Sequence, residues 1–352
     1  MEKIKVGIIG AGSISHFHTR AYQKLENVEV VAVCDLNEER AKAYAKEYHI
    51  PHVFTNHHDM LQMEDLDAVS VTTWNNGHAP ISIDALKAGK HVLCEKPLAM
   101  NAKEAEEMVK VSKETGKLLM VGFVRRFGEN TKLLKEAIEQ NQLGDVYYAK
   151  TGCIRRWGNP GGWFSDWKRS GGGPVIDLGV HMIDLVRYLN GKPKAVSVSA
   201  STFNQLGMKP DVKGMVKYYS ADYSTHNDVE DGATALIKFE NGLTLFFETS
   251  WVMHVKQDEL YLQLYGSKAG AQMEPTIEFY EERNNYFTDT TPVIDPNAYG
   301  FDSNFNREIA HFIDCLTHGI PCLNPAEDGL ELMKILDAIY ESAKTGREVI
   351  ID

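Results

Sequence analysis

Residues 6–15 read VGIIGAGSIS and join a short apolar run to a segment with a helical pattern. Gly10 permits a tight turn there, and Gly12 lets the backbone approach a pyrophosphate. The helix that follows presents its first amide groups and the positive end of its dipole to phosphate oxygens. Ser15 stands where a third glycine is usual, and a small residue still fits that packing position. The stretch predicts a strand–turn–helix unit that binds a dinucleotide. Its expected cofactor contacts are Gly10, Gly12, Ser13 and Ile14.

An acidic residue follows the second apolar run, in the sequence VAVCD of residues 31–35. A carboxylate at this place accepts hydrogen bonds from both ribose hydroxyls of the adenosine half, and it repels a 2′-phosphate. Asp35 therefore predicts NAD, rather than NADP, as the cofactor. The alternative is an ordinary aspartate in a loop or at a helix N-cap, and the glycine turn upstream favours the cofactor interpretation.

Strands and helices alternate through the first third of the chain. Strands with apolar residues on both flanks indicate a sheet that is covered on both faces. Strict alternation predicts right-handed crossovers and a doubly wound parallel sheet, so the fold class is α/β, with an N-terminal Rossmann domain over residues 1–122. The expected strands are 4–9, 28–34, 68–73, 91–94 and 118–123, and the expected helices are 13–25, 37–48, 80–88 and 102–115.

The pattern changes after about Val124, and residues 123–352 are expected to form an α+β domain for substrate binding and oligomerisation. Its strands follow one another without helices between them, and Asn241-Gly242 predicts a hairpin turn. A large, mostly antiparallel, open-faced sheet is therefore expected. Strands are expected at 195–202, 233–239, 243–251 and 260–265, helices at 175–189, 310–316 and 326–343, and loops at 204–227 and 281–302.

Composition excludes several classes of protein. The chain has 352 residues, of which 43% are hydrophobic, and a formal net charge of −12. Such a surface repels phosphate backbones, so no nucleic-acid partner is expected. The chain lacks an apolar run long enough to span a bilayer and a start typical of a signal peptide, so we expect a cytoplasmic protein without a membrane partner.

Cysteine and histidine spacing gives no sign of disulfides or metal. The five cysteines are odd in number and form no C-x-x-C pair, which favours reduced thiols. The close histidine pairs, His16/His18 and His57/His58, lack the spacing of a zinc site. We therefore predict no catalytic metal.

Two further motifs carry candidate catalytic groups. Glu95-Lys96-Pro97 follows a strand at the carboxyl end of the sheet, where open α/β folds bind ligands. Pro97 keeps Lys96 out of helical geometry, and the bond between them could be cis; either arrangement would direct the lysine at the crevice. The alternative is an exposed loop lysine.

The second motif is GGGPVIDLGVHMID, residues 171–184. Pro174 suits the first position of a helix, and Asp177 and His181, four residues apart, share one helix face. A carboxylate that orients an imidazole is the arrangement of a general base. The alternative is a carboxylate that merely complements the helix dipole, next to a structural histidine.

Taken together, these motifs resemble the glucose–fructose oxidoreductase, inositol dehydrogenase and rhizopine catabolism family, written Gfo/Idh/MocA. The resemblance covers nearly the whole chain. It rests on GIIGAGSIS with His18 and Ala21-Tyr22, AGKHVLCEKPLA at 88–99, Gly122-Phe123 with Arg125-Arg126-Phe127, the run 171–184, and Asp328-Gly329 with 343–346.

The family implies a hydride transfer between NAD and an alcohol. Lys96 would bridge the nicotinamide ribose and the substrate hydroxyl, and Asp177 and His181 would sit over the reacting carbon, with His181 as proton acceptor. The resemblance also implies a homodimer or homotetramer. The remaining cofactor contacts that it implies are Thr73, Trp74, Asn75, His78, Glu95 and Lys96.

The side chains before the catalytic helix suggest the substrate. Tryptophans mixed with charged groups between residues 155 and 168 suit a sugar, because rings stack on C–H faces and charges hydrogen-bond hydroxyls. We predict a secondary ring alcohol of a sugar or cyclitol. Phe164 stands where many members carry arginine after tryptophan. Together with the run 155–160 (RRWGNP) and Lys168, it gives a pattern that resembles the subgroup acting at sugar carbon 3. The expected substrate contacts are Arg126, Arg156, Trp163 and Lys168.

Two other functions stay open at this point. One is a glycosidase that retains NAD and oxidises the sugar transiently, and the other is a non-enzymatic NAD-binding sensor. The joint presence of Lys96, Asp177 and His181 argues against the sensor, which needs only the dinucleotide site.

Overall fold

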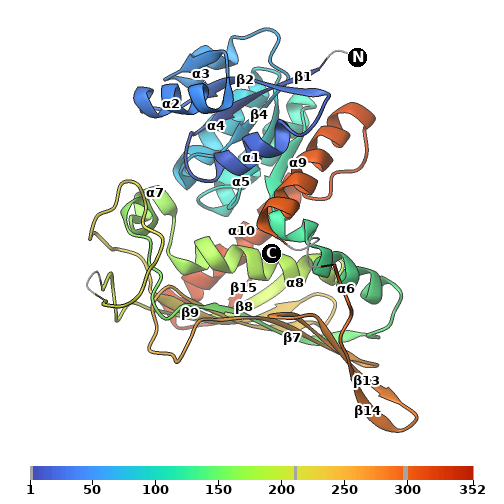
Figure 1. Ribbon diagram of the computed structural model, residues 1–352. Coiled ribbons are helices and arrows are strands. Elements are labelled where there is room, and N and C mark those ends of the chain that lie inside the picture. Colours follow the sequence, from blue (N-terminus) through green and yellow to red (C-terminus); the bar gives the residue numbers. More distant parts are fainter. Residues whose placement is uncertain (1–2, 210–211, 296–299, 352) are drawn as a thin grey trace. The chain divides into compact units, whose positions relative to one another are not determined.

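The computed structural model describes residues 3–209, 212–295 and 300–351 (Figure 1). Its contacts divide the chain into two compact units: Met1–Phe127 with Tyr299–Met333, and Gly128–Ala298 with Lys334–Asp352. The sequence predicts two consecutive domains, 1–122 and 123–352, whereas residues 299–333 return to the first unit. This return occurs because α9 (Phe301–His318) packs on α1 (Ser15–Tyr22), where Phe305 stacks on Phe17 with ring centroids 5.1 Å apart.

The first unit contains a six-stranded sheet in the order β3-β2-β1-β4-β5-β6, and all its strand pairs are parallel. This confirms the predicted doubly wound sheet. The strand order reverses between β1 and β4, and open α/β sheets bind ligands at the carboxyl ends of strands at such a switch point. The strands are β1 (Ile4–Ile9), β2 (Val28–Cys34), β3 (His52–Phe54), β4 (Ala68–Val71), β5 (His91–Glu95) and β6 (Leu119–Gly122).

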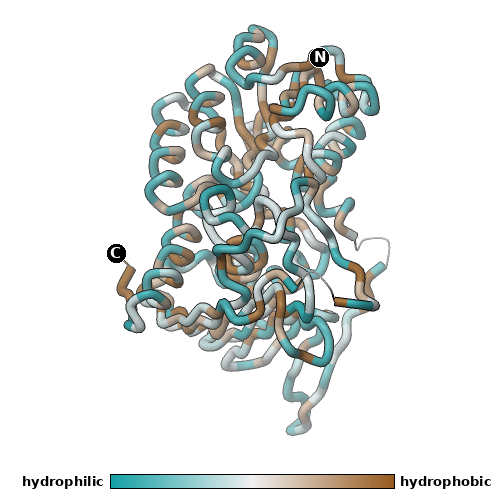
Figure 2. Tube along the Cα trace, turned by 90° about the vertical axis from the view of Figure 1, so that its left-hand side faces the viewer, coloured by the Kyte–Doolittle hydropathy of each residue, from teal (hydrophilic) through white to brown (hydrophobic). Residues whose placement is uncertain are grey.

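The other helices of this unit are α2 (Glu38–Tyr48), α3 (His57–Leu61), α4 (Asn75–Lys87), α5 (Ala102–Thr115), a 3₁₀ turn (Val124–Phe127) and the first part of α10 (Ala326–Thr345). Figure 2 shows hydrophobic and hydrophilic segments alternating along the helices, as expected where one side packs on a core. Three predicted helix starts were wrong: α1 begins at Ser15, α4 begins at Asn75, so that Pro80 lies inside the helix, and α9 begins at Phe301 rather than at residue 310. The elements β3 and α3 were not predicted because they are too short to show a period.

The second unit contains a nine-stranded sheet in the order β14-β13-β12-β11-β7-β10-β9-β8-β15. The pair β7–β10 is parallel and the other pairs are antiparallel, which confirms the mostly antiparallel prediction. The strands are β7 (Val146–Ile154), β8 (Ala195–Phe203), β9 (Gly232–Phe239), β10 (Thr244–Ser250), β11 (Glu259–Gly266), β12 (Gly270–Glu274), β13 (Glu278–Arg283), β14 (Tyr286–Thr290) and β15 (Val349–Ile350).

Turns explain one success and one error in this sheet. The predicted Asn241-Gly242 hairpin joins β9 to β10, with Gly242 at φ +87°. The expected loop 281–302 is wrong, since it contains the end of β13 and all of β14; its residues 296–299 lie outside the described part. Asn284 and Asn285 connect those strands at φ +53° and +63°. Two consecutive residues with positive φ form the tight turn that two-residue hairpins need, and asparagine tolerates it.

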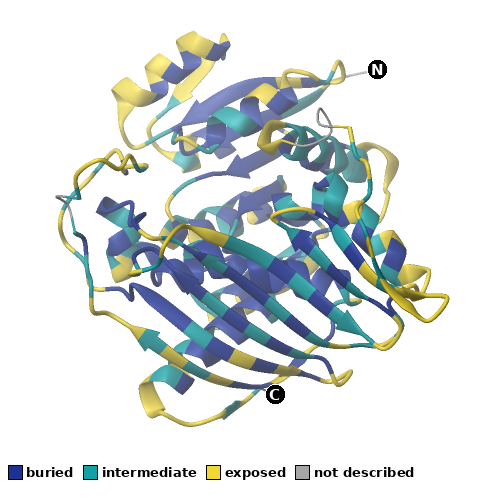
Figure 3. Ribbon diagram, turned by 60° about the horizontal axis from the view of Figure 1, so that its bottom comes forward, coloured by how far each residue is buried: buried dark blue, intermediate teal, exposed yellow. Residues whose placement is uncertain are grey.

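Helices cover one face of the nine-stranded sheet (Figure 1). They are α6 (Glu129–Glu139), α8 (Val180–Leu189) and the later part of α10, while α7 (Trp167–Ser170) lies at one end. The opposite face carries no helix in the part of the unit that is described, and Figure 3 shows buried residues alternating with intermediate or exposed ones along the strands. Among the described residues, none of the helices combines the length and apolar character that a bilayer crossing needs.

Candidate active site

The glycine turn after β1 has the geometry of a phosphate cradle. Gly10 adopts φ +100°, and a Cβ there would lie 2.6 Å from the carbonyl oxygen of Thr72, so only glycine fits. A Cβ on Gly12 would meet nothing within 4 Å, which leaves the backbone open to a ligand. Helix α1 then begins after Ile14, whose side chain makes no capping hydrogen bond. An open cradle at a helix N-terminus fits the pyrophosphate of a dinucleotide.

Asp35 lies directly beside this turn, at the end of β2. Its Oδ2 accepts a hydrogen bond from the Ala11 amide at 2.9 Å, and its Oδ1 accepts one from the Asn37 amide at 2.8 Å. The side chain is 10% exposed, and the Arg40 guanidinium lies 3.6 Å from Oδ2. The carboxylate is therefore held at the position where a dinucleotide fold binds the adenosine ribose. The donor set of this edge fits NAD.

Two loops at the carboxyl ends of neighbouring strands are tied together by His78 of α4. Its Nδ1 lies 2.7 Å from the Pro97 carbonyl oxygen, after β5, and its Nε2 lies 3.2 Å from the Thr73 carbonyl oxygen, after β4. Burial lowers the pKa of His78, and the two carbonyl contacts oppose that shift only in part. The buried imidazole fixes the loops that carry Trp74, Asn75 and Lys96, and the Lys96–Pro97 bond is cis.

Glu95 is a buried carboxylate next to Lys96. Its Oε1 lies 2.9 Å from Nε2 of His18, and its Oε2 accepts a hydrogen bond from the Lys96 amide at 3.1 Å. The Nδ1 of His18 lies 3.2 Å from the Ser70 hydroxyl. Burial opposes ionisation of Glu95, but the hydrogen bond and charge of His18 outweigh it and lower the pKa. Glu95 thus holds a negative charge that positions the backbone of the candidate catalytic lysine.

The helix that carries Asp177 and His181 starts differently from the prediction. Residues Val175–Gly179 form a π-helical turn, and α8 continues from Val180. Buried Glu230 accepts hydrogen bonds from the amides of Gly173 and Val175, both at 3.0 Å, and from the Tyr340 hydroxyl at 3.0 Å. Burial raises the pKa of Glu230. This side chain supplies acceptors to amides at the start of the helix and fixes where the helix begins.

Asp177 has a buried hydrogen-bond donor that the sequence did not indicate. The indole Nε1–H of Trp251, which follows β10, donates to Oδ2 of Asp177 at 3.1 Å. Trp251 is fully buried, while Asp177 and His181 are half-buried. A rigid donor of this kind fixes the carboxylate without neutralising it. The arrangement leaves Asp177 and His181 able to orient a substrate hydroxyl and to accept its proton.

Arg126 is not available to a substrate, and that prediction was wrong. Its side chain is fully buried in the first unit, with Nη1 2.7 Å from Oδ2 of Asp328 and 2.8 Å from the Leu323 carbonyl oxygen. The guanidinium also lies over the ring of Phe123, 4.9 Å from its centroid. Arg126 therefore connects the turn before α10 to the segment after β6. A buried charge must be paired, and Asp328 is its partner.

The other three predicted substrate residues lie in the second unit. Nη1 of Arg156 donates to the Lys256 carbonyl oxygen at 3.0 Å, and the Lys168 amide donates to Asp166 at the start of α7. The ring of Trp163 packs on Phe164 with centroids 4.0 Å apart, and Phe164 meets Trp251 edge-on at 6.5 Å. These aromatic contacts run from Trp251, the partner of Asp177, to Trp163.

The residues missed from the sequence share one property: each acts across a long sequence separation. His18 pairs with Glu95, Glu230 caps the helix at Gly173, and Trp251 donates to Asp177. Local spacing carries no signal for such pairs. Of the missed residues, only His18 could have been found from the sequence, because it belongs to the opening motif quoted above.

A doubly wound parallel sheet whose glycine turn and acidic residue fit NAD defines a dinucleotide-binding domain, and the family matches identify the chain as an oxidoreductase. Residues 4–123 match the family described as "Oxidoreductase family, NAD-binding Rossmann fold", and residues 135–351 match "Oxidoreductase family, C-terminal alpha/beta domain". The chain belongs to this Gfo/Idh/MocA family, and its cofactor is NAD.

Individual relatives match this chain over nearly the whole length of both proteins. The chain is 33% identical over 349 residues to D-glucoside 3-dehydrogenase of Escherichia coli (strain K12), covering 98% of this chain and 97% of the relative. It is 30% identical over 362 residues to myo-inositol 2-dehydrogenase of Thermotoga maritima, covering 99% of each. The solved structure of levoglucosan dehydrogenase in complex with NADH has the same fold, with a TM-score of 0.88 at 23% identity over 100% of both chains.

Proposed function

We propose that the protein oxidises a secondary ring hydroxyl of a sugar or cyclitol to a ketone, with NAD as hydride acceptor. The observation that carries this proposal is the half-buried pair of Asp177 and His181, with the carboxylate held by the buried indole of Trp251. The two relatives named above, which act on a glucoside and on inositol, support the substrate class. The first of them also supports carbon 3 of a glucoside as the reacting carbon.

The protein's part in this reaction is to position groups and move one proton. His181 accepts the hydroxyl proton at a ring nitrogen, and Asp177 orients the substrate and the imidazole. The Lys96 ammonium stabilises the negative charge that develops on the substrate oxygen. NAD, when bound, would supply the hydride acceptor. The reacting carbon gives up a hydride and its oxygen gives up the proton that His181 accepts, so the alcohol loses two electrons and two protons in all and becomes a ketone.

In this proposal the cofactor and substrate residues keep distinct roles. Gly10, Gly12, Ser13 and Ile14 bind the pyrophosphate, and Asp35 binds the adenosine ribose. The loop residues that approach the nicotinamide half are Thr73, Trp74, Asn75, His78, Glu95 and Lys96. Trp163, Arg156 and Lys168 remain the proposed substrate contacts, whereas Arg126 does not.

The test combines a substrate panel with matched variants. We expect sugars and inositols, but not linear alcohols or hydroxy acids, to produce NADH, and NMR should locate the new keto group on a ring carbon. Lys96→Ala and His181→Ala should each lower turnover about a hundredfold or more. The exposed residues Lys103 and His318 provide control substitutions to alanine. Near-wild-type turnover in a variant would remove that residue from the mechanism.

The same assay separates the NAD-retaining glycosidase from the dehydrogenase. A dehydrogenase accumulates one free NADH for each ketone, while the glycosidase cleaves glycosides without net NADH.

Oxidation should also rise with pH, because the accepting imidazole must be neutral. A flat profile between about pH 6 and pH 9 would argue against a histidine base.

The open face of the nine-stranded sheet supports a homodimer or homotetramer. Val196, Phe203 and Leu236 on strands β8 and β9 are 39%, 41% and 38% exposed. Apolar side chains along an uncovered sheet favour contact with a second copy. Light scattering should therefore give a mass of two or four chains.

The five free cysteines support a reducing compartment, and we place the enzyme in the cytoplasm.

A further inference from the structure

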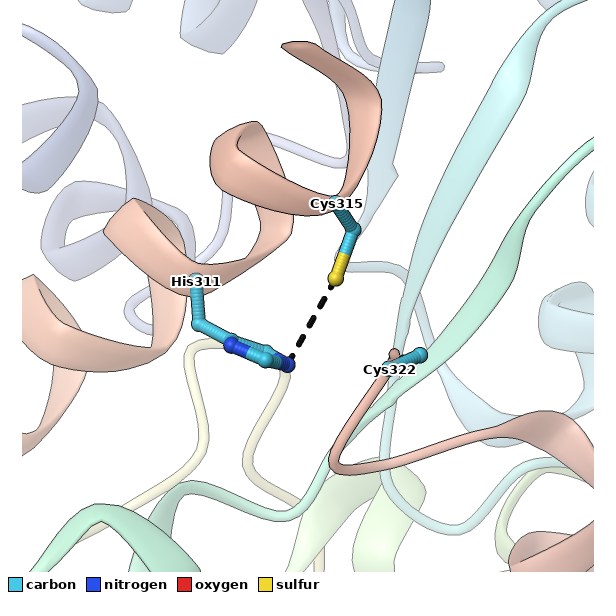
Figure 4. A group of neighbouring side chains, drawn as sticks. All are labelled: His311, Cys315 and Cys322. Carbon is cyan, nitrogen blue, oxygen red and sulfur yellow. Dashed lines mark hydrogen bonds between the residues drawn. The ribbon is translucent and has the colours of Figure 1, made fainter. Parts of the chain in front are cut away.

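Three soft metal ligands converge at the end of α9, in the first unit (Figure 4). His311 and Cys315 are four residues apart on α9, and Cys322 lies on the turn that follows the helix. The imidazole nitrogen and the two sulfur atoms all lie within 4.8 Å of one another. All three residues are half-buried, and none of them takes part in the proposed hydride transfer.

The separations fit a tetrahedral zinc ion. Zinc bonds of about 2.3 Å to sulfur and about 2.0 Å to nitrogen place the two ligand atoms about 3.5 Å apart at a tetrahedral angle. Nε2 of His311 and Sγ of Cys315 are 3.5 Å apart. Two thiolates on one zinc ion are about 3.8 Å apart. Since all three ligand atoms lie within 4.8 Å of one another, Sγ of Cys322 needs to approach Sγ of Cys315 by up to about 1 Å and the His311 nitrogen by up to about 1.3 Å. A side chain on a turn can make that movement by rotation.

The imidazole already presents the right nitrogen. The Leu323 amide donates a hydrogen bond to Nε2 of His311 at 2.8 Å, which places the ring proton on Nδ1 and the lone pair on Nε2. A metal ion would replace that amide as the partner of the lone pair. One peptide hydrogen bond is then given up while one metal–nitrogen and two metal–sulfur bonds form.

The donor set distinguishes this cluster from other groups of possible ligands. In the described residues, His57, His58 and Asp84 form one such group, and Asp166, His226 and Asp228 form another. Neither contains sulfur, and in the first His57 is already paired with Asp84 at 3.0 Å. Two cysteines with one histidine form a soft set that selects zinc over magnesium or calcium.

We propose that His311, Cys315 and Cys322 bind one zinc ion, with a water molecule as the fourth ligand. On binding, each thiol releases its proton to solvent and its sulfur forms a bond to the ion, so no electron transfer is needed. The role is structural, because the site would connect the end of α9 to the turn that follows it.

That turn supports the nucleotide-binding sheet. Within it, the Asn324 amide group donates to the Val121 carbonyl oxygen of β6 at 3.1 Å, and the Val121 amide donates to the Asn324 carbonyl oxygen at 2.9 Å. The Leu323 carbonyl oxygen accepts the hydrogen bond from Arg126. A zinc ion at Cys322 would thus restrain the backbone that pairs with β6, and bound zinc should raise the melting temperature.

The test measures metal content and ligation in the full-length protein. After treatment with a chelator and a phosphine reductant, zinc is returned and the excess removed. We expect about one zinc ion per chain by elemental mass spectrometry, and a melting temperature several degrees above that of the metal-free protein. Cys315→Ser and Cys322→Ser should lose the ion and the shift. Cys153→Ser, at a half-buried cysteine of β7 that forms no disulfide, is the matched control and should keep both.

Cobalt(II) provides a second measurement that does not depend on variants that fold. Cobalt bound to the wild-type protein should show thiolate-to-metal charge-transfer absorption and the visible bands of a tetrahedral ion. Either of two results would overturn the proposal. One is wild-type protein that binds no stoichiometric zinc and gives no thiolate band with cobalt. The other is a Cys315–Cys322 disulfide that reforms in air while the reduced protein takes up no zinc.

Discussion

Replacement of Asp35 by serine should weaken the binding of NAD and strengthen the binding of NADP. The carboxylate is held beside the glycine turn by the amides of Ala11 and Asn37, at the place where we propose that the adenosine ribose binds. A hydrogen bond to a charged group contributes about 1.5–3 kcal/mol, and serine can replace only part of what the carboxylate accepts. The Kd for NAD should therefore rise about 10- to 150-fold.

NADP should respond in the opposite direction. The substitution removes a negative charge that faces the 2′-phosphate, and it releases Arg40, whose guanidinium lies 3.6 Å from Oδ2 and whose side chain is 43% exposed. An exposed ion pair between Arg40 and the phosphate adds up to about 1 kcal/mol. The Kd for NADP should fall about fivefold, since each 1.4 kcal/mol changes affinity about tenfold.

The assay is titration of each cofactor by calorimetry, with the ratio of the two Kd values as the readout. Asp35→Asn keeps the shape of the side chain, removes its charge and replaces one of the two accepting oxygens by an NH2 group. Asp67→Ser is the matched control, because its carboxylate also accepts a backbone hydrogen bond, from the Lys5 amide at 2.8 Å. Asp67 precedes β4 and so lies at the amino-terminal ends of the strands, away from the nucleotide-binding turn. Tighter binding of NADP than NAD by the wild-type protein, or an unchanged ratio in Asp35→Ser, would refute the reasoning.

Three further substitutions test other parts of the structure. Trp251→Phe keeps a ring but removes the donor to Asp177, so kcat for sugar oxidation should fall about tenfold or more while the Kd for NAD stays the same; equal loss in both would point to misfolding. Asp328→Asn leaves the Arg126 guanidinium buried without its counter-charge, and the free energy of unfolding, measured in urea, should fall by about 3–5 kcal/mol. Burial raises the pKa of Glu308 in the folded protein well above its usual value, which it keeps in the unfolded chain. The stability that the neutral carboxyl contributes is therefore fully present at pH values below the unfolded pKa. It is lost as the pH rises through the folded pKa. Glu308→Gln should therefore gain melting temperature relative to wild type as pH rises from about 5 to 8, and a constant difference would contradict this.

The sequence predicted the first sheet well because its signals are local. Apolar runs such as Ile4–Ile9 and Val28–Cys34 are buried strands, and the glycine turn between β1 and α1 must lie at the carboxyl edge wherever the strands pair. Strand β7 shows the opposite case. Its sequence mixes Lys150, Thr151 and Gly152 into a central strand, so period and composition hide it. It is a strand because β10 and β11 satisfy its backbone from both sides.

Arg126 shows why a correct motif still misassigns a side chain. The run Arg125-Arg126-Phe127 was recognised, but sequence does not state whether a guanidinium reaches solvent or a partner. Asp328 lies 202 residues further along the chain, and only the packing of α10 in the first unit brings it within 2.7 Å. The same limit explains why the buried donor Trp251 was not found.

By itself, the sequence determined the α/β class, the family and the NAD-binding turn with Asp35, since each rests on residues close together in the chain whose chemistry acts over a few ångströms. It also placed Asp177 and His181 on one helical segment. Only the tertiary structure decided which polar side chains became buried partners. Those pairs, among them His18 with Glu95 and Trp251 with Asp177, join segments whose separation along the chain is closed by hydrophobic packing, and no local period encodes that closure.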